Sequence, residues 1–147
     1  MRFQILAAAL IAASPALADD DGDKPSFGMA GILSASNSET LPPILLSAGQ
    51  PLADAPLHLK SGTSYEIEIE ADGSQELGLV GAGFFHAIWI DEIVIEGIEI
   101  RPLGVDSVEF DEAGVMEISF VAIKPGTYDL HVPNARGDLQ RLEITIE

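Results

Sequence analysis

Three histidines, His58, His86 and His131, are the side chains in this sequence that could hold a transition metal, and they stand among 24 acidic residues. Imidazole nitrogens combined with carboxylate oxygens can bind copper or zinc. The sequence contains no cysteine, which excludes thiol nucleophiles and thiolate metal sites. Any metal site in this chain must therefore use nitrogen and oxygen ligands, with methionine as a further candidate.

Sequence signatures of catalysis are missing. The chain has no G-x-S-x-G, H-E-x-x-H, Walker or GxGxxG pattern. The adjacent carboxylates Asp91-Glu92 and Asp111-Glu112 are typical of solvated turns, and on a strand neighbouring side chains would face opposite ways. The sequence therefore predicts that the protein is not an enzyme.

The charge balance constrains the partners of the protein. A formal net charge of −17 disfavours nucleic acids and anionic lipids, which proteins bind through lysine and arginine. The same charge could favour a basic partner or cations. Outside Asp19–Asp23, however, most acidic residues alternate with apolar ones, which indicates that most of them form a soluble coat.

The N-terminus has the three parts of a bacterial signal peptide. Arg2 gives a minimal positive region, Phe3–Ala13 is apolar, and Ala16-Leu17-Ala18 forms a cleavage site. The apolar run is shorter than the roughly 20 residues that span a bilayer. We therefore predict a signal peptide at 1–18, a mature protein that starts at Asp19 in the periplasm or outside the cell, and no membrane insertion after cleavage.

The rest of the chain is predicted to be a short leader followed by a β domain. Residues 19–40 are polar or small without periodicity, which indicates a flexible acidic leader. Tyr65–Glu70 alternates apolar and acidic residues, the clearest strand signal. About eight or nine short strands separated by turns predict a β-sandwich over 41–147, with alternating faces that favour antiparallel pairing. The inward-facing side chains should include Tyr65, Ile67, Ile69, Tyr128, Leu130 and Val132.

Two segments of this domain resemble the cupredoxins of the plastocyanin and azurin type. Ala82–Asp91 is similar to the segment that carries the first copper histidine, with His86 on that histidine and Phe85 in place of a proline. Ser119–Tyr128 is similar to the entry into the strand that leads to the other ligands. The resemblance implies an antiparallel Greek-key β-sandwich.

The same resemblance implies that the type-1 copper site of the family is lost. A gapless comparison places Val132 on the copper-binding cysteine, Ala135 on the second histidine and Gln140 on the methionine. A type-1 centre needs the cysteine, so electron transfer of the family kind does not carry over.

The candidate site residues lie in the first of these segments. His58 and His131 are expected to face solvent because each alternates with inward-facing neighbours. His86 is either a hydrogen-bonded structural histidine or, with a carboxylate or Met29, part of a type-2 copper or other N/O site. Phe84, Phe85 and Trp89 form the densest aromatic cluster, which is either core or a patch that docks a partner.

Two functions remain open at this point. The first is an exported cupredoxin-like binding or accessory domain that engages a protein partner through Phe84–Trp89. The second is a periplasmic copper carrier that uses His86. Copper is the one cofactor that the sequence leaves open, and no nucleic acid is expected as a partner.

Overall fold

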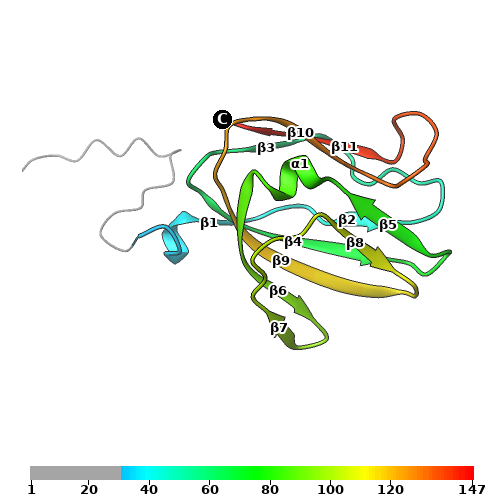
Figure 1. Ribbon diagram of the computed structural model, residues 1–147, viewed down its shortest axis with the longest axis horizontal. Coiled ribbons are helices and arrows are strands. Elements are labelled where there is room, and N and C mark those ends of the chain that lie inside the picture. Colours follow the sequence, from blue (N-terminus) through cyan, green and yellow to red (C-terminus); the bar gives the residue numbers. More distant parts are fainter. Residues whose placement is uncertain (1–30) are drawn as a thin grey trace, which may run out of the picture.

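The computed structural model describes residues 31–147 as a β-sandwich of two sheets (Figure 1). The six-stranded sheet A contains β1 (Ser38–Thr40), β4 (Ser64–Ala71), β9 (Gly114–Ala122), β6 (Ile88–Ile95) and β7 (Ile98–Ile100) in that order, with β2 (Ile44–Leu46) also paired to β4. The five-stranded sheet B runs β3 (Leu57–Leu59), β11 (Arg141–Ile146), β10 (Gly126–His131), β5 (Leu77–Val80) and β8 (Ser107–Phe110). The predicted signal peptide, the Asp19 terminus and Met29 lie outside the described residues.

Alternation places the apolar side chains between the two sheets, as predicted. Tyr65, Ile67 and Ile69 of β4 are buried, while the intervening glutamates face outward. On the strand pair of sheet B, Leu130 and Val132 are buried and Tyr128 is partly buried. A period of two residues turns every second side chain toward the same face, which explains why these positions could be assigned from sequence.

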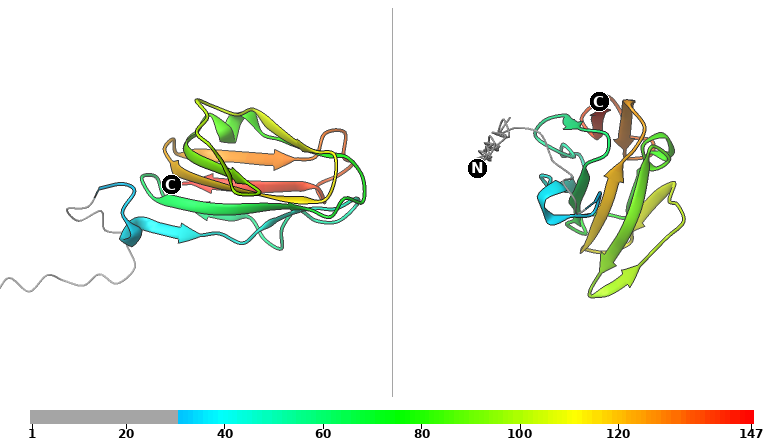
Figure 2. Two further views of the ribbon diagram at one scale, coloured as in Figure 1. Left: turned by 90° about the horizontal axis from the view of Figure 1, so that it is seen from below. Right: turned by 90° about the vertical axis from the view of Figure 1, so that its left-hand side faces the viewer.

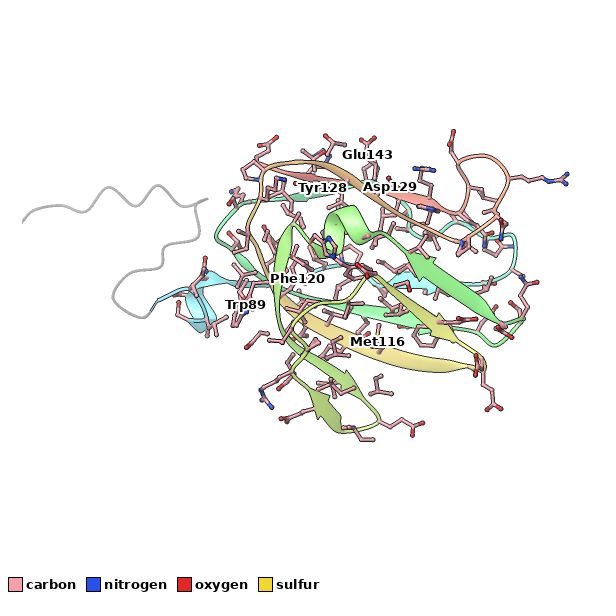
Figure 3. All side chains as sticks on the ribbon, in the orientation of Figure 1. Trp89, Met116, Phe120, Tyr128, Asp129 and Glu143 are labelled. Carbon is pink, nitrogen blue, oxygen red and sulfur yellow. The ribbon has the colours of Figure 1, made fainter. Side chains whose placement is uncertain are left out.

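Phe120 lies at the centre of the core (Figure 3). Its ring centroid lies 5.7 Å from that of Tyr65 and also 5.7 Å from that of Phe84, the latter at 85° in an edge-to-face contact. The three rings come from β4, β9 and the helical turn α1 (Ala82–Phe85). Aromatic packing therefore joins α1 to sheet A.

Strand pairing differs in part from the predicted antiparallel arrangement. The long pairs β4–β9, β6–β9 and β10–β11 are antiparallel. β1 and β2, however, both run parallel to β4, and β3 runs parallel to β11. Alternation specifies which face a side chain occupies and carries no information on the direction of the neighbouring strand, so the sequence pattern could not reveal these parallel pairs.

The last part of the predicted leader is attached to the sandwich. Residues 35–37 form a short 3-10 turn, η1 (Ala35–Asn37), and β1 follows directly on sheet A. The buried Asn37 donates its side-chain amide to the carbonyl oxygens of Ile32 (2.7 Å) and Gly62 (3.1 Å). These bonds and the β1 ladder hold a segment that composition alone had marked as flexible.

The chain after β5 forms α1 and then β6, and a two-residue turn places β7 beside β6. The two turn residues, Glu96 and Gly97, both have positive φ (50° and 79°). Both positive φ values match the type I′ turn, which suits the twist of a hairpin.

No helix among residues 31–147 is long and apolar enough to cross a membrane.

Candidate functional site

His86 stands at the surface just after α1. Its backbone N–H donates to the Ala82 carbonyl at 2.9 Å. The carbonyl of the following residue, Ala87, accepts from the backbone N–H groups of Ile123 and Lys124. The ring nitrogen Nε2 lies 2.8 Å from Oδ1 of Asp106, and about two thirds or more of each side chain is exposed (68% and 73%). His86 is therefore a hydrogen-bonded surface histidine that offers one imidazole and one carboxylate to solvent.

The fold does not bring His86 together with the other positions that the resemblance assigns to copper. β5 and β10 run antiparallel with Val80 opposite His131, so α1, which follows β5, lies beside the first half of β10. Val132 directly follows His131, the last residue of β10, and therefore lies past the C-terminal end of that strand. Gln140 donates its side-chain amide to the Ser47 carbonyl at 3.0 Å. Gln140, whose carbonyl accepts from the Val132 N–H, therefore lies with Val132 past the C-terminal end of β10, whereas α1 contacts earlier residues of that strand.

The other two histidines have their own surroundings. His58 is exposed on β3, as predicted. His131 is only partly exposed, with Nδ1 2.7 Å from Oδ2 of Asp129, an oxygen that also lies 2.8 Å from Arg141. Within residues 31–147, the group of three or more metal-ligating side chains brought within 4.8 Å contains no histidine. Asp106, Asp129 and His131 do line one shallow depression of about 550 Å³.

Of the predicted aromatic docking residues, the two phenylalanines belong to the core. Phe84 and Phe85 are 4% and 3% exposed and their ring centroids are 5.8 Å apart. They are buried because α1 turns them under the sandwich, where Phe84 contacts Phe120. Trp89 is 47% exposed on the outward face of β6, opposite Val121 (Figure 3). Only this member of the cluster is available to a partner.

The β6–β7 hairpin carries apolar side chains that the second sheet does not cover. Ile95 and Ile98 are cross-strand neighbours, and Ile100 is opposite the buried Ile93, so all four share the inward face of sheet A. Ile95, Ile98 and Ile100 are 38%, 64% and 43% exposed. Figure 1 shows the reason: the hairpin extends beyond the strands of sheet B. The core face of sheet A thus continues onto the molecular surface.

A groove of about 260 Å³ adjoins this apolar surface. Four of its lining residues, Ile95, Val108, Phe110 and Met116, are apolar. Its charged lining residues, Glu96, Glu109, Asp111 and Glu112, are all acidic, and Glu109 also lines a second hollow with Glu76. Asp111 and Glu112 are exposed in the bend between β8 and β9, as predicted, whereas Asp91 and Glu92 lie within β6. The groove was missed because it joins residues 95–96 of the hairpin to residues 108–116.

Carboxylates crowd one another beside this groove. Glu76, Glu109 and Asp111 place ligand oxygens within 4.8 Å of one another, and all three are exposed. A hydrogen bond with Glu109 and the charge of that residue raise the pKa of Glu76 above its usual range. Like charges are therefore closely spaced at this part of the surface.

A larger hollow of about 610 Å³ lies under residues 47–56. Its walls are mostly prolines and aliphatic side chains, with acidic groups from Asp54, Glu70 and Asp72. The pKa of Asp72 is lowered by hydrogen bonds from the side chain of Ser47 and from Ser74, and the Ser74 N–H lies 2.8 Å from Oδ1. Asp72 thus serves to close the turn after β4.

The outward face of sheet A also concentrates carboxylates. Glu117 of β9 is directly opposite Glu68 of β4, with Glu66 and Glu92 on the same face. Partial burial, followed by the charges of Glu66, Glu68 and Glu92, raises the pKa of Glu117. Arg101 lies near one side of this face, 2.6 Å from Glu92 and 3.2 Å from Glu99.

Replacing Glu117 with glutamine is expected to stabilise the protein at pH 7 by roughly 0.2–1 kcal/mol, because it removes a directly opposed like charge. A raised folded-state pKa means that the native protein binds this proton more tightly than the unfolded chain, so wild-type stability falls as pH rises from the ordinary value near 4.5. The advantage of Glu117→Gln should therefore vanish below that pH. Urea unfolding at pH 4 and pH 7 measures it, with Glu39→Gln as the control; equal gains for both variants would contradict this explanation.

Comparison with known proteins supports the fold. No protein-family model matches this chain, and no curated protein sequence matches it. Among solved structures, a multi-copper oxidase from Pseudomonas thermotolerans superposes with a TM-score of 0.57 and 15% identity over 78% of this chain and 31% of that one. A second multicopper oxidase gives a TM-score of 0.50 and 9% identity over 63% of this chain and 32% of that one.

These likenesses define the class of protein. The chain has a cupredoxin-like β-sandwich fold, as the two sequence segments had indicated. It spans about a third of the length of the two oxidases, which are similar to it in the fold of one domain. At this sequence identity the comparison supports a shared fold only. The activity of the oxidases is a property of those proteins and is not transferred to this chain.

Proposed function

We propose that this protein is an exported, cupredoxin-like accessory domain without type-1 copper that binds a protein partner. The observation that carries the proposal is the uncovered apolar surface of the β6–β7 hairpin, where Ile98 is 64% exposed. Contiguous apolar surface of this kind marks interaction sites when it is rimmed by polar groups. Export is supported by the signal-peptide pattern of residues 1–18.

The absence of type-1 copper in this proposal rests on the sequence and on the placement of the candidate ligands. The chain has no cysteine to supply the thiolate. Val132 lies past the C-terminal end of β10, whereas α1, which His86 follows, contacts earlier residues of that strand, so a Val132→Cys substitution would not complete the set. A role that depends on the surface of the domain therefore has more support than electron transfer.

A photo-crosslinking amino acid at position 98 is expected to give a discrete adduct when the full chain is expressed with its signal peptide. The matched control places the same group at Leu139, which is 52% exposed on the loop before β11. Mass spectrometry of the periplasmic fraction identifies the adduct. The proposal predicts at least about fivefold more adduct at 98 than at 139, because buried apolar contacts stabilise complexes; equal yields at both sites would overturn it.

The exposed His86–Asp106 pair favours one alternative, a weak type-2 copper site. Copper bound there should be colourless or faintly blue and exchangeable, because an intense visible band needs a Cu–thiolate bond. In a Cu(II) titration followed by desalting, His86→Ala should remove most of the bound metal and His58→Ala very little. Tight stoichiometric copper that survives desalting would favour the carrier, and retention in His86→Ala would place the site elsewhere.

A further inference from the structure

We propose that the groove between the β6–β7 hairpin and β8 binds a partner segment in which an apolar side chain is flanked by lysine or arginine. The inference rests on the proposed function and adds the chemistry of the partner. It commits to a basic segment because two properties meet at this one surface, apolar lining residues and charged lining residues that are all acidic.

The apolar lining residues supply the part of the site that an aliphatic or aromatic side chain would contact. Ile95 lies both in the groove and in the exposed row with Ile98 and Ile100. Phe110 of β8 and Met116 of β9 also line the groove. A partner side chain that enters here would remove exposed isoleucine from water, and burial of apolar surface favours association.

The acidic lining residues determine which charge such a partner must carry. Glu96, Glu109, Asp111 and Glu112 line the groove, and none of its lining residues is basic. Glu76 adds a further carboxylate beside Glu109 and Asp111. The nearby hairpin cation, Arg101, already lies within 3.2 Å of Glu92 and Glu99 on the outward face of the sheet. Lysine or arginine side chains would therefore find carboxylates without a competing cation.

A second copy of this chain fits the surface poorly. It would bring another formal charge of −17 and the same acidic groove to the contact. Like charges across an interface oppose association, whereas opposite charges raise both specificity and the association rate. Charge complementarity therefore favours a basic partner over self-association.

The test uses three labelled hexapeptides with full-length mature protein in fluorescence anisotropy. The first peptide has leucine-isoleucine between two lysines on each side; the second replaces every lysine with glutamate; the third replaces leucine-isoleucine with serine-serine. We expect the first peptide to bind at least about tenfold more tightly than either of the others, since the site needs both charge and apolar contact. Equal binding of the first and third peptides would overturn the proposal, because it would leave only non-specific attraction.

Matched variants then locate the binding. Glu109→Gln with Asp111→Asn should weaken binding of the first peptide at least about tenfold, whereas Glu143→Gln with Asp138→Asn, which makes the same change in net charge elsewhere, should change it less than about threefold. Ile98→Ser should weaken binding at least about threefold and Leu139→Ser should not. Thermal unfolding confirms that each variant is folded. Equal losses in the groove and control variants, or concentration-dependent dimerisation without peptide binding, would refute the proposal.

The partner role of the hairpin and the chemistry of the groove can be refuted separately. Crosslinking at position 98 to a partner without a basic segment would retain the proposed function and remove this inference. Absence of crosslinking together with specific, groove-dependent peptide binding would retain the groove chemistry and remove the partner role of the hairpin in the cell.

Discussion

Replacing Phe120 with alanine is expected to lower the free energy of unfolding by about 3–5 kcal/mol, the usual range for a fully buried phenylalanine. Phe120 is 1% exposed, and its ring contacts the rings of Tyr65 and Phe84. Its removal would leave a cavity between two sheets that α1 cannot fill without breaking its own contacts. Urea denaturation followed by intrinsic fluorescence measures the change.

The control for this experiment is Ile123→Ala. Ile123 lies just beyond the same strand but is 48% exposed, so its loss should cost well under half as much. A cost for Phe120→Ala below about 1.5 kcal/mol would mean that the rings around position 120 do not form the packed centre described above.

Replacing Gly81 with alanine should also destabilise the protein strongly, by about 1–3 kcal/mol or more. A Cβ atom there would lie 2.4 Å from Cδ2 of Leu130 and 2.7 Å from the carbonyl oxygen of Asp129. The backbone oxygen cannot move without disturbing β10, which pairs with β11 along its whole length. The φ of Gly81 is extended (174°), so the cost comes from this close approach and not from an unusual backbone conformation.

Gly78→Ala gives the matched comparison. A Cβ at that position would meet its nearest neighbour, Pro133, at 3.5 Å, which is an ordinary contact. Thermal unfolding should therefore show a much smaller shift for Gly78→Ala than for Gly81→Ala. Similar shifts for the two variants would show that loss of glycine flexibility, and not the crowding at Asp129, governs the effect.

The sandwich could be predicted from sequence because strand alternation reports burial directly. Tyr65, Ile67, Ile69, Leu130 and Val132 were assigned to the core by this pattern, and the structure buries all of them. Whether neighbouring strands run parallel or antiparallel could not be predicted in the same way. The parallel partners of β4 and β11 depend on how short N-terminal segments cross the sandwich, which no local pattern encodes.

The candidate site was less predictable than the fold. Phe84 and Phe85 were candidates for a docking patch, but α1 buries both, and a four-residue helical turn has no reliable sequence signature. The exposed isoleucines of β6 and β7 were not recognised from the sequence. Their exposure depends on the hairpin extending past sheet B, a relation between elements that lie far apart in the chain.

The bonds that hold the N-terminal segment bear on how this domain could be attached to a surface while its groove stays open to solvent. On the N-terminal side, Asn37 donates to Gly62, and Gly62 donates to Ala122. On the C-terminal side, Glu147 bonds to Leu59 and Ser61. Both ends of the described chain therefore lie near the Ala122 end of β9. The groove lies at the Gly114 end, a strand length of about 27 Å away at roughly 3.3 Å per residue. Figure 2 (left) shows the C-terminus and the start of the described chain toward the same end of the sandwich. Tethering the domain through Glu147 would thus display the groove outward, so immobilisation at that point is compatible with binding from solution.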